Sequence, residues 1–275
     1  MDGSVRIIEV LPVQEGALRD PMQELREALE GTTSHPASAH PVHLDLKREQ
    51  RTGVPEIIQA SGKEVATVLA IVQTFLDQNS RAILSRVGSR MAREIREYFV
   101  DYRVDEYPRA RMLVVRRPDS RPHRTGGRVG IITAGSSDAP YAEEAKIVAE
   151  EMGCTTDMIY DVGVAGLHRL VSPLHRLLEE RVNAIIVAAG MDGALPSVIA
   201  GLVDVPVIGL PTATGYGIGG RGLAALMSML QTCVPGLTVV NVNNGIGAGA
   251  CAARIANAVA LARSEAGEIS LSAHV

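Results

Sequence analysis

The feature that most constrains the fold is a regular alternation of apolar, β-rich runs with helix-length segments, which starts near Arg128. The runs cover residues 129–133, 156–161, 184–188, 206–210 and 237–242. Such an alternation predicts an α/β fold with a doubly wound parallel sheet. The chain has only two Phe and no Trp, so its core must be built from Ala, Val, Ile and Leu. Those residues suit parallel strands that are buried on both faces.

The first part of the 275-residue chain is less regular. A helical pattern over residues 15–30 is followed by a stretch rich in Gly, Ser and Pro, so we expect residues 1–44 to be a helical, mobile extension. Residues 45–117 predict a small α/β unit, with a helix ending near Asp77, strands over 81–87 and 111–117, and a helix over 89–99. We interpret residues 118–127 as a linker, 128–265 as the main domain and 266–275 as a tail.

Charge and cysteine content exclude several classes of protein. The net charge is −4. Residues 1–127 contain 19 basic and 18 acidic residues, whereas residues 128–275 contain 8 basic and 13 acidic residues. No basic stripe with interleaved aromatic residues occurs, which argues against a nucleic-acid partner. Cys154, Cys233 and Cys251 match neither a zinc pattern nor a disulfide framework. No apolar run approaches the ~20 residues of a membrane span, and the N-terminus lacks a signal-peptide pattern. We therefore predict a cytoplasmic protein that does not bind a membrane.

Segments rich in small residues follow each predicted strand of the main domain. They cover residues 134–138, 162–166, 189–195, 211–222 and 243–249. Loops that follow parallel strands share one edge of the sheet, and doubly wound folds bind ligands there. Small side chains let a ligand approach the backbone closely. The sequence therefore predicts a small-molecule site at this edge.

The first of these loops, residues 135–138, joins a strand directly to a helix. Pro140 suits the first helical turn, and Glu143 and Glu144 complement the positive end of the helix. Several backbone N–H groups converge at such a junction, so the loop can bind phosphate, with Ser136, Ser137 and Asp138 within reach. The alternative interpretation is an ordinary, well-capped turn between a strand and a helix.

Three further side chains suggest chemistry. Arg221 lies in the glycine-rich 211–222 segment, which is neither a Walker A loop nor a dinucleotide fingerprint, and it is a possible phosphate partner. Asp192 could hold a metal ion, accept a proton or cap the following helix, and its spacing favours capping. Cys233 is the reactive cysteine candidate at the ligand edge, although the negative end of the preceding helix disfavours a thiolate there.

Several motifs that contain these residues resemble those of known families. The Gly-Ser-Ser-Asp loop ending at Asp138 and the Gly-Ala-Leu-Pro motif ending at Pro196 resemble the PurE superfamily, which moves carboxyl groups on phosphorylated ring substrates. Purine-pathway members carry a His where this chain has Ala194. From about residue 45 the chain is more similar to the LarB family of pyridinium-3,5-biscarboxylic acid mononucleotide synthases. The motifs that carry this similarity are Asp45-x-x-Arg48-x-x-Arg51-x-Gly53-x-Pro55-Glu56, Gly62-Lys63, Thr133 to Asp138, Ala189 to Ser197, Pro211-Thr-x-x-Gly-Tyr-Gly217, Cys233 and Asn244-Gly-x-Gly-Ala-Gly249.

The LarB resemblance implies a two-part reaction on nicotinic acid adenine dinucleotide. The pyridinium ring is carboxylated at C5 with CO₂, and the phosphoanhydride is hydrolysed to release AMP, in the pathway to a nickel-pincer cofactor. By this resemblance Cys233 is the nucleophile that adds to ring C4, and the cationic ring offsets the unfavourable helix end. The family has Glu where this chain has Asp192, which would be the base for the C5 proton or a ligand of Mg²⁺.

The resemblance and the loop positions together define a set of candidate substrate-binding residues. They are Gly135, Ser136, Ser137, Asp138, Gly190, Gly193, Thr212, Gly215, Tyr216, Gly217, Arg221, Asn244 and Gly245. Arg48, Arg51 and Lys63 would either reach substrate phosphates or pair with Asp45 and Glu56. PurE-like proteins form symmetric oligomers with sites between subunits, so a homo-octamer is expected.

Two other functions stay open at this point. One is a purine-pathway carboxyl mutase, which Ala194 and the extra N-terminal unit disfavour. The other is a non-catalytic nucleotide-binding module, which has no need for a cysteine at the ligand edge.

Overall fold

A computed structural model describes Met22, Arg26 and residues 44–272 of the chain. The predicted helix over 15–30 and most of the predicted extension 1–44 lie outside the described residues. The described residues 44–272 belong to one compact unit. Within it, two sheets are built from consecutive parts of the chain: four strands from the N-terminal part and five from the C-terminal part.

The N-terminal sheet has the strand order β1-β2-β4-β3. Its strands are β1 (Ile57–Gln59), β2 (Arg81–Ser85), β3 (Arg103–Tyr107) and β4 (Met112–Arg116), and its helices are α2 (Arg48–Thr52), α3 (Val65–Asn79) and α4 (Ser89–Tyr98). β2, β4, α3 and α4 confirm the sequence prediction. β1 and β3 were missed, because β1 has three residues and β3 carries charges at Arg103, Asp105 and Glu106. Charged side chains of this kind are typical of an edge strand.

The C-terminal sheet is parallel throughout and has the order β6-β5-β7-β8-β9. The strands are β5 (Arg128–Thr133), β6 (Thr155–Ile159), β7 (Ala184–Ala189), β8 (Val207–Pro211) and β9 (Leu237–Val239). All five predicted strands are present. β9 is shorter than predicted because a turn over residues 241–244 follows it. In this turn the Asn244 N–H donates to the Asn241 oxygen at 3.2 Å and Asn243 adopts a positive φ.

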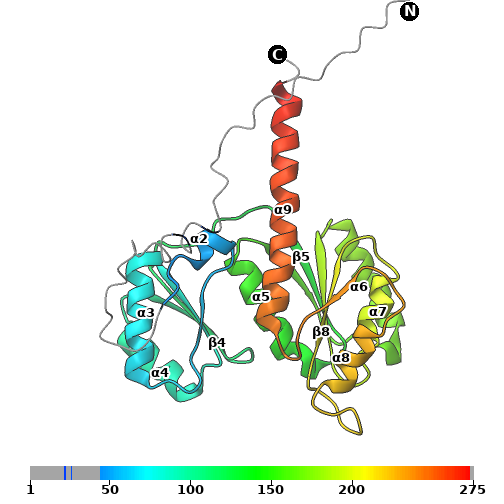
Figure 1. Ribbon diagram of the computed structural model, residues 1–275, viewed down its shortest axis with the longest axis horizontal. Helices are drawn as coiled ribbons and strands as arrows, with labels where there is room; N and C mark the ends of the chain where they lie inside the picture. The colour runs from blue at the N-terminus through cyan, green and yellow to red at the C-terminus, as the bar shows by residue number, and fades with distance from the viewer. Residues whose placement is uncertain (1–21, 23–25, 27–43, 273–275) are drawn as a thin grey trace, which may run out of the picture. The chain divides into compact units, whose positions relative to one another are not determined.

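Helices cover both faces of this sheet (Figure 1), as the alternation predicted. α5 (Ala139–Glu151) and α9 (Gly245–Ser272) lie on one face, and α6 (His168–Glu179), α7 (Leu195–Ala200) and α8 (Leu223–Leu230) lie on the other. Two short 3₁₀ turns, η1 (Ser136–Asp138) and η2 (Val164–Gly166), precede α5 and α6. Each face has its own apolar core. The core on the α5 and α9 face also includes Ile83 and Val114 of the N-terminal sheet, so the two sheets share apolar packing.

Helix α9 differs from two expectations. It continues to Ser272, so most of the predicted tail 266–275 is helical. Of the helices in the described part of the chain, α9 alone is long and apolar enough over Gly245–Ser264 to span a membrane by length and composition, contrary to our reading of the sequence. The small residues in its first turns allow α9 to pack closely against α5. A Cβ on Gly249 would lie 2.4 Å from the Ala145 backbone oxygen of α5, so the two helices need a glycine there.

Candidate functional site

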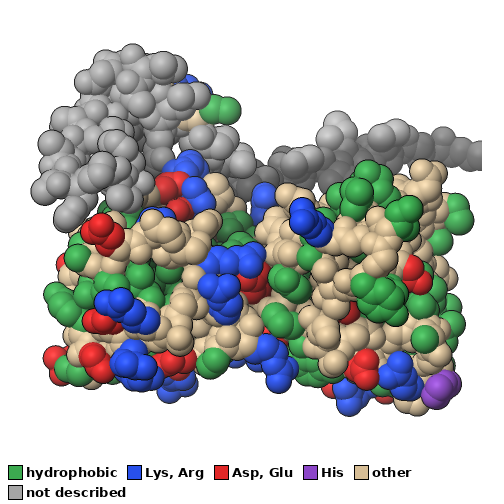
Figure 2. Space-filling view, turned by 90° about the horizontal axis from the view of Figure 1, so that it is seen from below, with side chains coloured by type: hydrophobic (Ala, Val, Ile, Leu, Met, Phe, Trp, Pro, Cys, Tyr) green, Lys and Arg blue, Asp and Glu red, His purple; other side chains and the backbone are tan. Residues whose placement is uncertain are grey.

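The loops that follow β5, β7, β8 and β9 meet at the carboxyl edge of the C-terminal sheet. The strand order places the change of direction between β5 and β7, where doubly wound folds bind ligands. Figure 2 shows the molecule of Figure 1 from below. The loop between β8 and α8 projects on this side. Near the middle of that face, Lys or Arg side chains gather beside acidic ones.

Asp138 links the loop after β5 to the loop after β8. Its side chain is buried, Oδ2 accepts the Gly135 N–H at 2.8 Å, and Oδ1 accepts the hydroxyl of buried Thr212 at 2.6 Å. β7 lies between β5 and β8 in the sheet, so this bond passes over the end of β7. Asp138 therefore has a structural task, while Ser136 and Ser137 stay exposed to solvent at the helix entrance.

Gly190 makes this crossing possible. A Cβ at Gly190 would lie 2.3 Å from the Thr214 backbone oxygen and 2.7 Å from Thr212 Oγ1. The next residue, Met191, donates its N–H to that same Thr214 oxygen at 2.7 Å. Any larger side chain would push the loop after β8 away from Asp138. Glycine is thus required at position 190 by a close backbone approach.

The loop after β9 joins the same assembly through two asparagines. Asn243 Oδ1 accepts the Ala213 N–H at 2.8 Å, and Asn244 Oδ1 caps α9 by accepting the Gly247 N–H at 2.8 Å. Gly245 lies so close to α5 that a Cβ would be 2.3 Å from the Tyr141 backbone oxygen. Four of the five predicted loops are therefore connected through backbone groups and short polar side chains.

Other predicted residues play a lesser part in this assembly. Asp192 is exposed, and its Oδ1 accepts the Ala194 N–H at 3.2 Å. This bond lies before α7, whose N-cap is Ala194 and which has no side-chain cap hydrogen bond, so Asp192 does not take the capping position that its spacing favoured. Gly193, with φ of 68°, packs against Ala225 of α8. Tyr216 and Arg221 lie in the exposed tip of the loop after β8, together with Gly215 and Gly217, and neither side chain forms a hydrogen bond or ion pair with the described residues.

Cys233 does not lie at the carboxyl edge of its own chain, which corrects our expectation. β8 ends at this edge, α8 then runs back across the sheet, and residues 231–236 connect α8 to the start of β9. The Val207 N–H at the start of β8 donates to the Gly236 oxygen, so this connection lies at the amino edge. Cys233 is exposed there, whereas Cys154 is buried and Cys251 is half-buried in α9.

A buried acidic residue that the sequence did not single out lies beside the assembled loops. Glu144 was expected to complement the positive end of the helix, but it lies beyond the first turn of α5 and is buried next to Gly245. Its Oε1 lies 3.8 Å from Arg86 Nη2, and its buried Oε2 has no hydrogen-bond partner among the described residues. Burial raises the pKa of the Glu144 carboxyl to about 7, opposed by the charges of Arg86 and Arg111 and by the Gly245 N–H.

Arg86 connects the N-terminal unit to this corner of the site. It follows β2, adopts a φ of 56° and donates from Nη2 to the Asn243 backbone oxygen at 3.3 Å. Nothing in the sequence pairs Arg86 with Glu144, because Arg86 follows a strand of the N-terminal sheet whereas Glu144 lies in α5 of the C-terminal part. By contrast, Arg48 pairs with Asp45 and Glu56, Arg51 pairs with Asp45, and Lys63 donates to the Gln59 oxygen. Those three basic residues therefore engage groups of their own unit.

Comparison with known proteins agrees with this architecture. Residues 37–117 match the LarB/PurE-like N-terminal domain, and residues 128–266 match the AIR carboxylase domain. That order of two domains is the LarB arrangement. The chain belongs to the LarB family. Its C-terminal domain has the PurE-like α/β fold that the sequence predicted.

Several known proteins are similar to this chain. An uncharacterized protein of Methanocaldococcus jannaschii is 44% identical over 78% of this chain and 83% of its own length. Two N5-carboxyaminoimidazole ribonucleotide mutases match less of the chain. The one from Thermotoga maritima is 34% identical over 46% of this chain and 74% of its own length. The one from Pyrococcus abyssi is 37% identical over 42% of this chain and 64% of its own length. This LarB chain is thus similar over its C-terminal part to enzymes named for a nucleotide substrate.

Proposed function

We propose that the chain carboxylates the pyridinium ring of nicotinic acid adenine dinucleotide at C5 and hydrolyses its phosphoanhydride, releasing AMP and a biscarboxylated mononucleotide. The observation that carries the proposal is the set of four joined loops at the carboxyl edge, in a chain with the LarB order of domains. Such an edge suits an anionic ligand, because backbone N–H groups at the start of α5 and α9 point outward there.

In the proposed carboxylation, the Cys233 thiolate adds to ring C4 and gives a dihydropyridine. The enamine carbon C5 then attacks CO₂, forming a carbon–carbon bond and leaving a cationic iminium. Loss of the C5 proton restores the enamine, and expulsion of the thiolate from C4 restores the aromatic pyridinium. Covalent catalysis of this kind is needed because a pyridinium carbon is too electron-poor to attack CO₂ directly.

Within this scheme Asp192 would take the C5 proton or bind Mg²⁺. The described residues contain no cluster of three or more His, Cys, Asp or Glu side chains that could hold a metal ion. Mg²⁺ commonly binds through one or two carboxylates together with substrate phosphates, and one free oxygen of Asp192 fits that mode. Bound there, the ion would polarise the phosphoanhydride. The cytoplasmic location inferred from the sequence remains a prediction.

The position of Cys233 requires that a second copy of the chain completes the site. α8 carries an exposed apolar stripe of Leu223, Met227 and Leu230 that runs from the carboxyl edge to the segment holding Cys233. If two copies pair through this stripe about a two-fold axis perpendicular to α8, their α8 helices run antiparallel. Because α8 is only about 12 Å long, Cys233 of one copy would then reach the carboxyl edge of the other. This arrangement agrees with the homo-oligomer expected from the sequence.

The test is incubation of the protein with nicotinic acid adenine dinucleotide, bicarbonate and Mg²⁺, with products identified by mass. We expect AMP and a doubly carboxylated mononucleotide, and a Cys233→Ala variant should lose carboxylation by more than about a thousandfold. Cys251→Ala is the matched control and should retain activity. Absence of both products would refute the proposal. Conversion of N5-carboxyaminoimidazole ribonucleotide instead would favour the mutase named for the relatives.

A further inference from the structure

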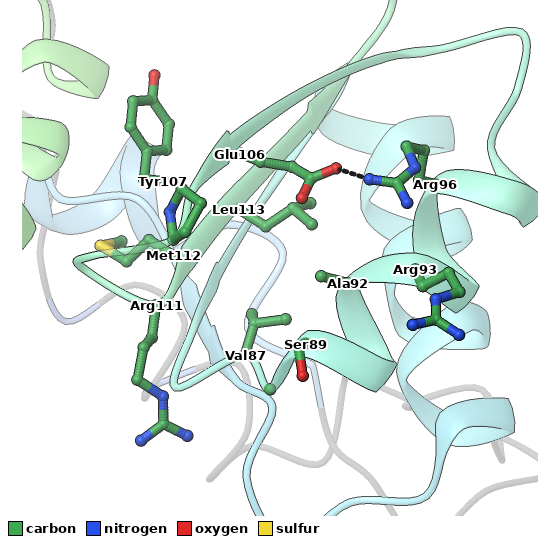
Figure 3. Close-up of a pocket in the computed structure, with 12 residues that line it drawn as sticks. Val87, Ser89, Ala92, Arg93, Arg96, Glu106, Tyr107, Arg111, Met112 and Leu113 are labelled. Atoms are coloured by element: carbon green, nitrogen blue, oxygen red, sulfur yellow. Dashed lines mark hydrogen bonds and ion pairs between the residues drawn. The ribbon is translucent and has the colours of Figure 1, made fainter.

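A cavity lies in the N-terminal unit, and one of its lining residues, Arg111, also acts through its charge on Glu144. Its volume is about 350 Å³, and it lies between the loop after β2, helix α4 and the turn that joins β3 to β4 (Figure 3). Known small-molecule sites have volumes from about 300 Å³ upward, so the cavity is large enough for a small ligand. The Val87 N–H donates to the Arg111 oxygen at 2.8 Å, which fixes two of its walls to each other.

The lining of this cavity carries an excess of positive charge. Arg93, Arg96 and Arg111 line it, and Glu106 is the acidic residue among them. Arg96 is already engaged, because its Nη1 lies 2.6 Å from Glu106 Oε1. Arg93 and Arg111 form no ion pair within the part of the chain that the structure describes. In Figure 3 their side chains lie on either side of Val87 and Ser89. Both guanidinium groups line the same cavity without an ion-pair partner in hydrogen-bonding range among the described residues, and the charge of Arg111 also acts on the Glu144 carboxyl.

Backbone groups add to the positive field of this cavity. Helix α4 has ten residues and begins after Gly88, which has an extended backbone and no side-chain cap hydrogen bond. The first-turn N–H groups of α4 are therefore not satisfied by a capping side chain, and they carry the positive end of the helix dipole. Gly88 and Ser89 both line the cavity. The guanidinium groups and the helix end are independent sources of attraction for the same anion.

Part of the remaining lining is apolar. Ala92, Pro108 and the half-buried Tyr107 ring provide surface beside the arginines, and Val87, Met112 and Leu113 form an almost fully buried layer beneath it. A ligand that matches both the basic part and the apolar part of the lining carries a phosphate at one end and an apolar or flat ring at the other. Arginine suits phosphate in particular, because its planar guanidinium donates two parallel hydrogen bonds.

We infer that this cavity is a binding site for a phosphomonoester of nucleotide size, with its phosphate held by Arg93, Arg111 and the start of α4. The inference does not depend on the reaction proposed for the carboxyl edge. The Arg96–Glu106 pair forms a neutral side of the site and holds α4 against β3.

The site is tested by calorimetric titration of the full chain with AMP, ribose 5-phosphate and adenosine in turn. AMP and ribose 5-phosphate should bind, and adenosine should bind at least about tenfold more weakly, because it lacks the charged group. Affinity for AMP should fall as salt is raised. Absence of binding by both phosphorylated probes at millimolar concentration would overturn the inference.

Variants locate the binding on the chain. Arg93→Gln and Arg111→Gln should each weaken AMP binding about tenfold or more. Arg90→Gln is the matched control, since Arg90 is on the same helix but highly exposed, pairs with Glu94 and does not line the cavity. Unchanged affinity in both Arg93→Gln and Arg111→Gln, with loss of binding in Asp138→Asn, would assign the nucleotide to the carboxyl edge and overturn the inference. Melting temperatures equal to that of the parent protein establish that the variants are folded.

Discussion

Glu144 shows how a single buried carboxyl group can influence the whole site. Its side chain contacts the backbone that starts α9, and its Oε2 lacks a hydrogen-bond partner among the described residues. An unpaired buried charge is costly, and the group reduces the cost by holding its proton to a higher pH. Since Arg86 also contacts Asn243, the protonation state of Glu144 affects how the N-terminal unit holds the loop after β9.

Stability should fall with pH because of this group, and Glu144→Gln should remove the effect. The pKa of Glu144 is raised from 4.5 to about 7, so the folded chain binds more protons than the unfolded chain between these values. Its stabilising contribution is therefore complete below a pH of about 4.5 and is lost as the pH rises through about 7. At pH 8, Glu144→Gln should be more stable than the parent protein by up to about 3 kcal/mol, and at pH 5 the two should be similar.

Denaturant unfolding at a series of pH values measures this difference. Glu143→Gln is the matched control, because Glu143 is adjacent in sequence and forms an ion pair with the exposed Arg109. Its unfolding free energy should follow the parent protein across the range. Parallel curves for the parent protein and Glu144→Gln from pH 5 to pH 8 would show that Glu144 is not the group responsible.

At the scale of elements, the two sheets are joined by a buried network of charges. Arg116 of β4 and Glu151 of α5 are both buried, and their Nη2 and Oε1 atoms lie 2.6 Å apart. Arg81 of β2 and Asp105 of β3 extend the network on either side. The arginines and Asp105 come from the N-terminal sheet, whereas Glu151 comes from the helix that starts at the Gly-Ser-Ser-Asp loop.

Removing Glu151 should destabilise the chain strongly. Glu151→Ala leaves the Arg116 guanidinium buried without its carboxylate, which costs about 3–5 kcal/mol. The double variant Glu151→Leu with Arg116→Met should recover much of that loss, because it removes both charges. Equilibrium unfolding in urea gives the free energies. Glu150→Ala, which breaks a partly exposed pair with Lys146 and the hydrogen bond that Glu150 accepts from Thr156, should cost at most about 2 kcal/mol. A cost for Glu151→Ala as small as that of the control would contradict the argument.

The elements also show which parts of the structure can be predicted from sequence. The five strands of the parallel sheet were predictable because each is an apolar run followed by small residues. The strand β3 was not, because it carries charged residues in place of an apolar run, and their partners Arg96 and Arg116 lie on the neighbouring elements α4 and β4. The buried position of Glu144 was equally hidden, since it depends on the start of α9 reaching α5. The location of Cys233 could have been inferred, because a helix that follows one parallel strand must return to the opposite edge before the next.

At the scale of the whole molecule, the separation of Cys233 from the joined loops determines how the protein must work. If Cys233 is the nucleophile, each site uses loops from one chain and a thiol from another. A chain in isolation would bind substrate without carboxylating it. Oligomerisation would then be a condition for the chemistry as well as a source of stability.

Mixing two inactive variants tests this arrangement. Cys233→Ala lacks the thiol, and Asp192→Ala lacks the exposed carboxylate of the loop after β7, so each should be inactive alone. Mixed dimers would contain one site with both wild-type residues, so co-refolded equal mixtures should regain about one quarter of the parent activity. Recovery would be measured as the rate of AMP and biscarboxylated product formation. Failure to recover any activity, with dimers shown to exchange subunits, would mean that Cys233 does not act across copies.

The hydrogen bonds among the four loops restrict how such a chain can diverge. Asp138, Thr212, Met191 and Asn243 each contact a loop other than their own, so an insertion in any one loop disturbs the other three. The exposed tip around Tyr216 is different, since its side chain forms no hydrogen bond or ion pair with the described residues. Related chains that acquire new substrates should therefore vary in length and composition at this tip while the loops around Asp138 stay constant.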